Sequence, residues 1–500
     1  MLQICTLAMR NLSCVFMNHS VLDQVYHPEI FKEKGMALIS MLSNHLNEVL
    51  TESKTNANVW ESPEQERVFW KDFLKNGDET TLFKTILDRS IHVHHPKYIG
   101  HQVTPTAPIT ALSSALSAFL NNGMAVYEMG KASSAIERII TDSICEKIGF
   151  DNKSRGILTS GGTLANLTAL LSARKAKVAS NVWSNGHGAS LGILVSEEAH
   201  YCVDRAARIM GLGDEGIIKI KATSGYGMDV SCLGQALANA KKQGIQVFAI
   251  VGSAPSTSTG IYDDLEAIAA FSKANDLWFH VDGAHGGAAI YSNIYRHTVK
   301  GIEQADSVVI DGHKMMMMPA LTTALLYKNG EHSQATFQQK ADYLLQQSDD
   351  EDWYNIAKRS FECTKTMMSI HWFTLLKLYG ESVFDAYVTT LYDKGIGFAK
   401  QLKQREYYDI AVAPMSNIVC FRYTPNSVAK TQWNELNIKI RQALLEDGEF
   451  YIVQTKLRGI NYLRVTIMNP YTTETHFANL LKKIETIAES LITGNKLGTS

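Results

Sequence analysis

The sequence lacks the charge imbalance that is typical of proteins that bind nucleic acids or membrane surfaces. Its 500 residues carry 48 Lys and Arg against 50 Asp and Glu, which gives a formal net charge of −2. A chain so balanced offers no basic surface for nucleic acid and no polybasic segment for anionic lipid. We therefore expect a small-molecule partner, with no nucleic acid and no membrane.

Cysteine is scarce and scattered along the chain. The seven cysteines are odd in number and form no CxxC pair, so the pattern indicates neither a disulfide framework nor a zinc site. His92, His94 and His95 precede a proline in an expected loop and lack a further ligand at helical spacing. The sequence therefore predicts a cytoplasmic protein without a metal.

Long apolar runs, internal repeats and Gly/Ser linkers are also missing. The opening segment MLQICTLAMRNLSCVF is apolar but is broken by Arg10 and lacks a basic leading region, which argues against a signal peptide and a membrane span. Met17 is an alternative start. Without linkers the domain borders are approximate: we expect a helical N-terminal segment over 1–95 that packs in a dimer, a large domain over 96–375 and a small one over 376–500.

The middle of the chain instead alternates short apolar runs with helical patterns. Hydrophobic residues make up 45% of the sequence, enough for a large core. Runs rich in β-branched residues, separated by amphipathic segments, are typical of an α/β domain with a mostly parallel central sheet. The runs are GILVS, IQVFAIVGSA, WFHVD, SVVID and TALLY.

Two of these runs end beside residues that suit one cofactor. Asp282 closes the run WFHVD, and Lys314 follows the run SVVID. The carboxyl ends of neighbouring parallel strands lie at one edge of a sheet. Pyridoxal phosphate requires a lysine amine to hold its aldehyde and a carboxylate beside its pyridine nitrogen. The small residues Gly283, Ala284 and Gly286 would let the planar ring approach the backbone. The sequence therefore predicts a pyridoxal phosphate site.

Three segments together resemble the pyridoxal-dependent decarboxylases, the family that includes glutamate, diaminobutyrate and aromatic amino acid decarboxylases. The segments are HVDGAHGG, ADSVVIDGHKMM and SGGTLANLTALLSARKA, and the likeness runs from about His95 to the C-terminus. The resemblance implies a fold-type I homodimer, similar to aspartate aminotransferase, with a small α+β C-terminal domain. It makes Lys314 the cofactor-binding lysine and Asp282 the partner of the ring nitrogen, and it places Ala284 and His313 among the cofactor contacts.

The start of the helical pattern after ILTSGGT is the expected phosphate site. A helix N-terminus presents unpaired N–H groups and a positive dipole end to an anion. The alternative is an ordinary glycine-rich helix start with an N-cap residue. The resemblance identifies Gly162 and Thr163 as phosphate contacts.

Two further residues resemble cofactor contacts of the family. His200 follows the run GILVS, and a flat aromatic ring there could stack on the pyridine ring and help to move a proton. A histidine that only caps a helix is the alternative. Thr257 resembles a cofactor-contacting threonine, although a plain turn in a Ser/Thr-rich loop would look the same.

Decarboxylation needs an acid for the α-carbon and a hold on the substrate. Tyr343 lies in QQKADYLLQQSDDED, which resembles the catalytic loop of the family and would exclude water as a lid; an exposed surface tyrosine is the alternative. Arg464 resembles the arginine that grips a substrate carboxylate through two parallel hydrogen bonds. His101 falls in the substrate-pocket segment, where glutamate decarboxylases carry a glutamine, and this departure puts glutamate specificity in doubt.

Asp311 is a second departure from the family pattern. It stands where aromatic amino acid decarboxylases tend to have an asparagine, and a carboxylate near the phosphate would repel it unless it is turned away or paired. We give Asp311 no role from sequence.

The sequence thus predicts a lyase of amino acid metabolism that acts on a small acidic or diamino L-amino acid, of the glutamate, aspartate or 2,4-diaminobutyrate type. Two alternatives stay open. One is another fold-type I reaction, such as transamination or sulfur removal. Sulfur removal requires a nucleophilic cysteine in a mobile loop, and Cys363, in a helical setting, is a poor candidate. The other is a catalytically inactive relative that only binds a partner, against which the intact lysine, aspartate, histidine and tyrosine argue.

Overall fold

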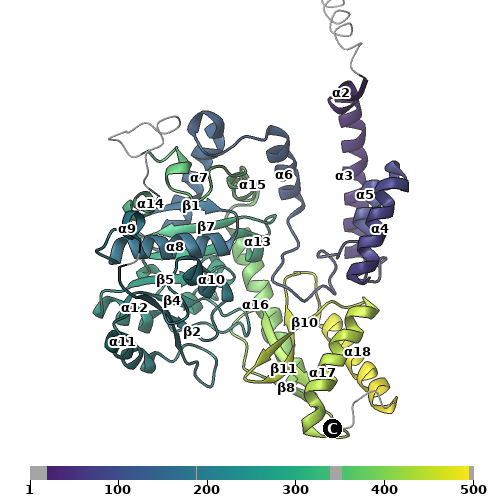
Figure 1. Cartoon of the computed structure of the whole chain (residues 1–500). Coiled ribbons are helices and arrows are strands. Elements are labelled where there is room, and N and C mark those ends of the chain that lie inside the picture. Colours follow the sequence, from purple (N-terminus) through teal and green to yellow (C-terminus); the bar gives the residue numbers. More distant parts are fainter. Residues whose placement is uncertain (1–19, 187, 338–351, 495–500) are drawn as a thin grey trace, which may run out of the picture.

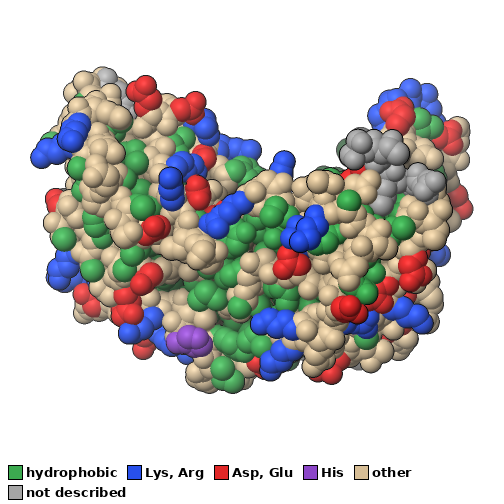
Figure 2. Space-filling model, turned by 90° about the horizontal axis from the view of Figure 1, so that it is seen from below, with side chains coloured by type: hydrophobic (Ala, Val, Ile, Leu, Met, Phe, Trp, Pro, Cys, Tyr) green, Lys and Arg blue, Asp and Glu red, His purple; other side chains and the backbone are tan. Residues whose placement is uncertain are grey.

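The computed structural model describes residues 20–186, 188–337 and 352–494 of the chain. Figure 1 shows three parts: a large α/β unit, a smaller unit toward the C-terminus, and a helical arm that stands beside them. Seen from below, the outline is hollowed between its two ends, and hydrophobic side chains gather across the middle of the face (Figure 2). The expected α/β fold with a helical N-terminal segment is confirmed, whereas the domain borders near 95 and 375 stay a prediction.

A sheet of seven strands forms the centre of the large unit, in the order β1-β7-β6-β5-β4-β2-β3. Strands β2 to β6 pair in parallel, while β7 runs antiparallel to both β6 and β1. The strands are β1 (Arg155–Thr159), β2 (Leu191–Ser196), β3 (Ile217–Ile220), β4 (Gln246–Ser253), β5 (Trp278–Asp282), β6 (Ser307–Asp311) and β7 (Thr323–Tyr327). Their side chains are almost all buried because helices cover both faces, and this explains the unbroken apolar runs.

Helices cover the two faces of this sheet and build one hydrophobic core on each. Along β4, Ile250 packs in one core and Val251 in the other, as the alternation of a strand requires. Helices α8 (Gly162–Lys177) and α10 (Tyr201–Ile209) contribute to the core that contains Val251. Helices α7 (Tyr127–Ile148), α11 (Leu233–Lys242) and α12 (Leu265–Ala274) contribute to the core that contains Ile250.

The smaller unit is a four-stranded antiparallel sheet in the order β10-β11-β9-β8, packed with three helices. The strands are β8 (Tyr408–Ile410), β9 (Ile418–Tyr423), β10 (Val453–Leu457) and β11 (Ile460–Thr466), and the helices are α16 (Ser382–Lys403), α17 (Trp433–Asp447) and α18 (Glu474–Thr493). Strand β11 is flanked on both sides by other strands, so its residues are held firmly.

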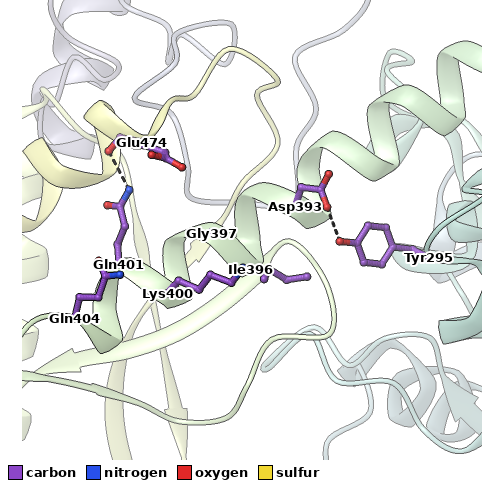
Figure 3. Close-up of a pocket in the computed structure, with 8 residues that line it drawn as sticks. All are labelled: Tyr295, Asp393, Ile396, Gly397, Lys400, Gln401, Gln404 and Glu474. Atoms are coloured by element: carbon purple, nitrogen blue, oxygen red, sulfur yellow. Dashed lines mark hydrogen bonds between the residues drawn. The ribbon is translucent and has the colours of Figure 1, made fainter.

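A half-open hollow of about 640 Å³ lies along α16 (Figure 3). The Tyr295 hydroxyl donates to Asp393 at 2.6 Å on one side, and the amide of Gln401 donates to the carbonyl of Glu474 at 3.4 Å on the other. None of the residues that line it was predicted as a site residue.

The arm consists of α2 (Ser20–Val25), α3 (Pro28–Leu50), α4 (Pro63–Asn76) and α5 (Leu82–Asp88). Pro28 and Pro63 occupy the first helical position of α3 and α4, where a missing N–H costs nothing. The long helix α3 buries only His45 and Val49, and large hydrophobic side chains on the rest of it are exposed.

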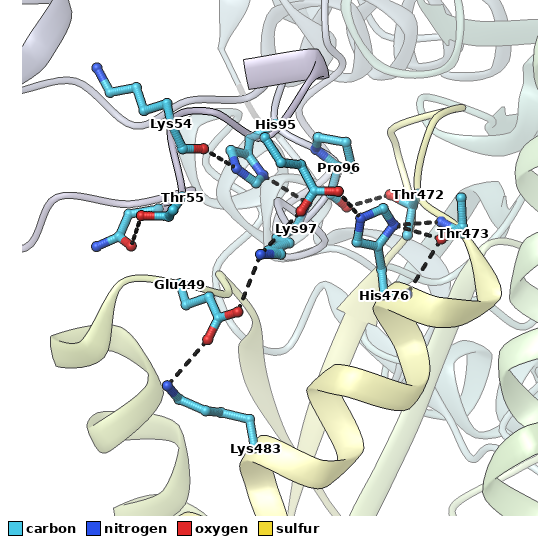
Figure 4. A network of polar contacts seen from close by, with 12 residues as sticks. Lys54, Thr55, His95, Pro96, Lys97, Glu449, Thr472, Thr473, His476 and Lys483 are labelled. Carbon is cyan, nitrogen blue, oxygen red and sulfur yellow. Dashed lines mark hydrogen bonds and ion pairs between the residues drawn. The ribbon is translucent and has the colours of Figure 1, made fainter. Parts of the chain in front are cut away.

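Ion pairs fasten the base of the arm to the smaller unit (Figure 4). The ammonium of Lys97 lies 3.1 Å from a carboxylate oxygen of Glu52 and 3.2 Å from one of Glu449. His476, on α18, lies 2.7 Å from the other oxygen of Glu52. Lys483, also on α18, lies 3.2 Å from Glu449. The arm is therefore attached at its base, while α2 and most of α3 extend beyond it.

Shorter elements complete the described part of the chain. They are α6 (Pro108–Leu120), α9 (Val182–Asn185), α13 (Gly312–Met315), α14 (Glu331–Thr336), α15 (Ser369–Tyr379) and the 3₁₀ helices η1 (Glu79–Thr81), η2 (Val230–Cys232), η3 (Gly286–Tyr291), η4 (Arg296–Val299), η5 (Ile302–Gln304), η6 (Ile356–Lys358) and η7 (Lys430–Gln432). Within the described ranges, none of the helices combines the length and the apolar character needed to cross a bilayer.

Candidate active site

The predicted cofactor residues lie where two parallel strands end. Asp282 is the last residue of β5, and β6 ends at Asp311, after which α13 carries Lys314. The two strands are direct neighbours, with Asp282 paired to Val309 in parallel register. The expected position of both side chains at one edge of the sheet follows from this register.

Lys314 is held by carboxylates at this edge. Its ammonium nitrogen lies 3.1 Å from Oδ2 of Asp311. Burial acts to lower the pKa of Lys314, but the carboxylates of Asp311 and Asp282 outweigh it, and the pKa is raised above its ordinary value. An amine bonds to an aldehyde only after it loses its proton, so the hold of these carboxylates would have to be relieved for Lys314 to react with one.

The carboxylate of Asp311 is paired with neighbouring side chains. This is one of the two arrangements in which it would not repel a phosphate. The hydroxyl of Thr323 donates to its Oδ1 at 2.6 Å, while its Oδ2 faces Lys314 and lies 3.6 Å from Nε2 of His313. Thr323 belongs to the antiparallel strand β7, directly opposite Asp311. Nδ1 of His313 lies 2.9 Å from the carbonyl oxygen of Thr322, so this ring is fixed beside Asp311.

The start of α8 approaches the same carboxylate. A Cβ atom at Gly162 would come within 3.1 Å of Oδ1 of Asp311 and 3.5 Å of the Cβ of Ala284. Gly161 has a φ of 105°, a conformation that favours glycine, and no side chain caps the first turn. Thr163 is exposed at this end of the helix.

Ser160, just before this turn, has a partner that the sequence did not reveal. Its hydroxyl donates to Oε1 of Glu362, and its backbone N–H donates to Oε2 at 3.4 Å. Glu362 comes from a segment 202 residues further along the chain. A carboxylate therefore lies close to the position where an anion is expected to bind.

His200 caps α10 and also belongs to the site. Its Nδ1 accepts the backbone N–H of Cys202 at 3.3 Å, so the capping alternative describes a real contact. Burial lowers the pKa of His200; the Asp282 carboxylate opposes this shift, and the Lys314 ammonium adds to it. Both groups act on the pKa of His200, so the structure places this ring near Asp282 and Lys314. Asp282 is itself buried and accepts the N–H of Ala284 at 3.2 Å.

Arg464 reaches the large unit from β11. Its Nη1 donates to the carbonyl oxygen of Thr257 at 2.7 Å, and only 8% of the residue is exposed. Its Nε has no hydrogen-bond partner, and no carboxylate among the described residues lies within ion-pair distance of the guanidinium. Burial lowers its pKa. A buried cation without a counter-charge is costly, which favours an anionic ligand at this place.

His285 connects the two ends of the site, and the sequence did not single it out. It is buried, its Nε2 lies 2.8 Å from Oδ1 of Asn417, and its Nδ1 has no partner among the described residues. Burial lowers the pKa of His285 to about 3, and the charges of Lys314 and Arg464 contribute. Its position in HVDGAHGG, three residues after Asp282, was the only signal that could have identified it.

The remaining predicted residues are placed less centrally. His101 is exposed, and burial of part of its ring, with Arg464 and Arg441 nearby, lowers its pKa. Its ring centroid lies 5.8 Å from that of Tyr451. Tyr343 falls in 338–351, outside the described residues. Across the described ranges, no three His, Cys, Asp or Glu side chains come together as a metal site.

These residues fit pyridoxal phosphate. The Lys314 amine and the Asp282 carboxylate lie at the ends of adjoining strands, and the His200 ring caps the helix beside them. The start of α8 has no side-chain cap. It lies so close to Asp311 and Ala284 that a Cβ at Gly162 would fill the space between them. Lysine, carboxylate, stacking ring and anion-binding helix start are the four contacts that the cofactor requires.

Comparison with known proteins leads to the same cofactor. The family model "Pyridoxal-dependent decarboxylase conserved domain" matches residues 75–424. The chain is 27% identical to an L-2,4-diaminobutyrate decarboxylase of Acinetobacter baumannii over 83% of this chain and 85% of that one. It is 27% identical to an aspartate 1-decarboxylase of Aliivibrio fischeri over 82% of each. The glutamate decarboxylase domain of diaminobutyrate-pyruvate transaminase and L-2,4-diaminobutyrate decarboxylase from Vibrio parahaemolyticus superposes with a TM-score of 0.80 at 26% identity, covering 91% of this chain and 96% of that one.

Proposed function

Because the chain belongs to the pyridoxal-dependent decarboxylase family, we propose that it removes CO₂ from a small acidic or diamino L-amino acid. The family makes pyridoxal phosphate the cofactor and an amino acid the substrate. The observation that carries the proposal is the placement of Lys314 and Asp282 at the ends of the neighbouring strands β6 and β5, with the charge of each acting on His200.

Each residue of the site has one task in this proposal. Lys314 would hold the cofactor through its aldehyde, Asp282 would favour a proton on the ring nitrogen, and His200 would lie against the ring. Bound there, pyridoxal phosphate supplies an electron sink for the bonding pair that CO₂ leaves behind. Gly162 and Thr163 bind the phosphate at the start of α8, and Ala284, Thr257 and His313 contact the cofactor.

The substrate is held and protonated by residues from other elements. Arg464 receives a substrate carboxylate, since its guanidinium is buried and has no counter-charge among the described residues. His101, close enough for Arg464 to lower its pKa, contacts the rest of the substrate. Tyr343 gives its phenolic proton to the α-carbon. The small acidic or diamino class is supported by relatives named for 2,4-diaminobutyrate and aspartate.

The direct experiment is a screen of the purified holoenzyme for CO₂ release from the twenty amino acids, 2,4-diaminobutyrate and ornithine. We expect release from one acidic or diamino acid and a visible absorption band of lysine-bound cofactor. A band without CO₂ from any of these would contradict the proposed reaction, and release from an aromatic amino acid alone would contradict the substrate class.

Arg464→Met is expected to lower kcat/KM by about 10- to 100-fold, mostly through KM, because a charge-assisted hydrogen bond contributes about 1.5–3 kcal/mol. The visible cofactor band should be unchanged, since the hydrogen bond that Arg464 donates to the large unit goes to the backbone carbonyl of Thr257 and not to Lys314, Asp282 or His200. Steady-state kinetics and an absorption spectrum test both points.

Arg422→Met is the matched control for that substitution. Arg422 lies on the neighbouring strand β9, but its guanidinium is already paired with Asp409 at 2.8 Å. Its replacement should leave KM unchanged. An equal rise of KM in both variants would show that the loss is structural and would remove the carboxylate role from Arg464.

The proposal includes a homodimer formed through the arm. Phe31 on α3 and Phe119 on α6 are 64% and 69% exposed, although their ring centroids are 5.4 Å apart. Leu112 and Leu116 are exposed on the same face of α6 as Phe119 and extend this apolar surface. Exposed apolar patches of this kind mark protein interfaces, and a symmetric second copy is the commonest partner.

Leu116→Asp combined with Phe119→Asp is expected to shift the enzyme from dimer to monomer and to reduce activity with it. Analytical ultracentrifugation at several concentrations measures the shift. Ile209→Asp is the control, because Ile209 is 64% exposed at the end of α10 in the large unit. A double variant that sediments like the unmodified enzyme would argue against this interface.

A cytoplasmic location completes the proposal. All five cysteines that the structure describes, at 145, 202, 232, 363 and 420, are free thiols. Free thiols are typical of reducing compartments.

A further inference from the structure

A line of five buried side chains runs through the large unit beneath the candidate site. Nε1 of Trp278 donates to Oγ of Ser307 at 2.9 Å, and the same hydroxyl lies 2.8 Å from Nδ1 of His280. Nε2 of His280 lies 2.7 Å from Oδ1 of Asn166, whose amide nitrogen donates to the sulfur of Cys202 at 3.4 Å. Each of the five is at most 2% exposed.

The partners determine the direction of every hydrogen bond in this line. The amide oxygen of Asn166 can only accept, so a His280 ring with one proton carries it on Nε2, and its Nδ1 accepts from the Ser307 hydroxyl, whose oxygen accepts the indole N–H of Trp278. His280 then carries its proton on Nε2 and donates it to Asn166. Burial lowers the pKa of His280 to about 4, which keeps this single-proton form at neutral pH.

Two members of the line belong to the helices that carry cofactor contacts. Asn166 lies one turn along α8 from Gly162 and therefore on the same side of the helix. Cys202 lies two residues after His200 on α10. Burial raises the pKa of the Cys202 thiol, and the charges of Asp282 and Lys314 also act on it, so this sulfur is close to the reacting groups.

The other members belong to the two strands whose ends form the site. His280 precedes Asp282 by two residues on β5, so both side chains leave the same face of the sheet. Ser307 opens β6, the strand that leads to Lys314. One unbroken line therefore joins α10, α8, β5 and β6. His200 caps α10, Gly162 and Asp282 lie on α8 and β5, and β6 leads directly into α13, which carries Lys314.

We infer that Asn166 and His280 are positioning residues for the cofactor: their hydrogen bonds fix the carboxylate of Asp282 relative to the ring of His200 and the start of α8. The inference rests on the proposed cofactor site. Apolar packing alone tolerates small shifts between elements, whereas a fully satisfied buried network permits one arrangement. At metal sites, removal of such supporting contacts changes affinity or activity by about 10- to 100-fold, and we expect an effect of the same order here.

Asn166→Leu tests this inference, because leucine has a similar volume and cannot bond to His280 or Cys202. In the holoenzyme we expect a shifted visible absorption maximum and cofactor circular dichroism, a cofactor Kd raised about tenfold or more, and a lower kcat with little change in KM. The unmodified holoenzyme is measured alongside; absence of its visible band would count against the proposed function itself and not against the positioning role.

Ser172→Ala is the matched control on the same helix. The Ser172 hydroxyl is equally buried and lies 2.8 Å from the hydroxyl of Tyr327 and 2.6 Å from that of Thr336, away from the line. Its replacement should lower Tm and leave the cofactor spectrum and Kd unchanged. Equal spectral shifts in both variants, or an unchanged spectrum and Kd in Asn166→Leu, would overturn the inference.

A pair of substitutions at His280 decides the question even if Asn166→Leu fails to fold. A glutamine amide nitrogen can take the place of Nε2 and keep the bond to Asn166, whereas an asparagine is too short to reach it. We expect His280→Gln to retain the spectrum and Kd of the unmodified holoenzyme and His280→Asn to lose them. Identical spectra and Kd values for the two variants would contradict a role for the bond between His280 and Asn166.

Discussion

Lys314→Ala is expected to abolish CO₂ release and to remove the visible band of lysine-bound pyridoxal phosphate. The amine that bonds to the cofactor aldehyde is lost, and no other lysine amine of the described residues lies beside Asp311. Loss of a group that bonds covalently during catalysis lowers kcat on the order of 10⁴-fold or more. Absorption spectra and CO₂ release, measured on the same preparation, test the two effects together.

Lys314→Arg separates the chemistry from the charge. Alanine leaves Asp311 buried with Thr323 as its remaining close partner and is expected to lower stability, whereas arginine keeps a cation beside the carboxylate. Both variants should lack the band and the activity, but the arginine variant should keep more of the original Tm. Substantial CO₂ release by either variant would show that Lys314 is not the cofactor-binding lysine.

Asp282→Asn is expected to lower kcat by about 10²- to 10⁴-fold, the range over which a positioned proton-transfer group acts. The substitution keeps the volume of the side chain and removes the negative charge that favours a proton on the ring nitrogen. Because the Asp282 carboxylate also raises the pKa of His200, that pKa should fall further in the variant. The kcat values and a nuclear magnetic resonance titration of His200 give the two measurements.

Asp263→Asn is the control for a buried carboxylate near the same edge of the sheet. Asp263 accepts the backbone N–H groups of Met228 and Ser253, and burial raises its pKa to about 6. Its replacement should affect stability more than kcat. If Asp263→Asn lowered kcat as much as Asp282→Asn, both carboxylates would be acting by supporting the edge of the sheet. The role of Asp282 at the pyridine nitrogen would then be contradicted.

The parts of the site that sequence reasoning found are those that local pattern determines. Asp282 and Lys314 each follow an apolar run, and Gly162 opens a strong helical pattern, so their positions depend only on where strands end and helices begin. The pairing of neighbouring parallel strands then brings the first two together.

The parts that sequence reasoning missed depend on contacts between distant segments. Thr323 meets Asp311 only because β7 inserts between β1 and β6 in antiparallel direction, and nothing in the run TALLY indicates that order. Glu362 reaches Ser160, and Asn417 reaches His285, from segments more than a hundred residues away. The packing of distant segments brings these partners together, and no periodicity in the sequence indicates which segments will pack.

Arg464 belongs to the smaller sheet, whereas Asp282 and Lys314 lie at strand ends of the larger one. This separation bears on how such an enzyme changes over evolutionary time. Substitutions at distant sites without shared partners act almost independently. In the proposed function, mutations around β11 that leave His285 and Thr257 in place can therefore alter what is bound while the larger sheet stays intact. A gene duplicate could thus acquire a new metabolic role through a few changes in its last hundred codons, without first passing through an inactive ancestor.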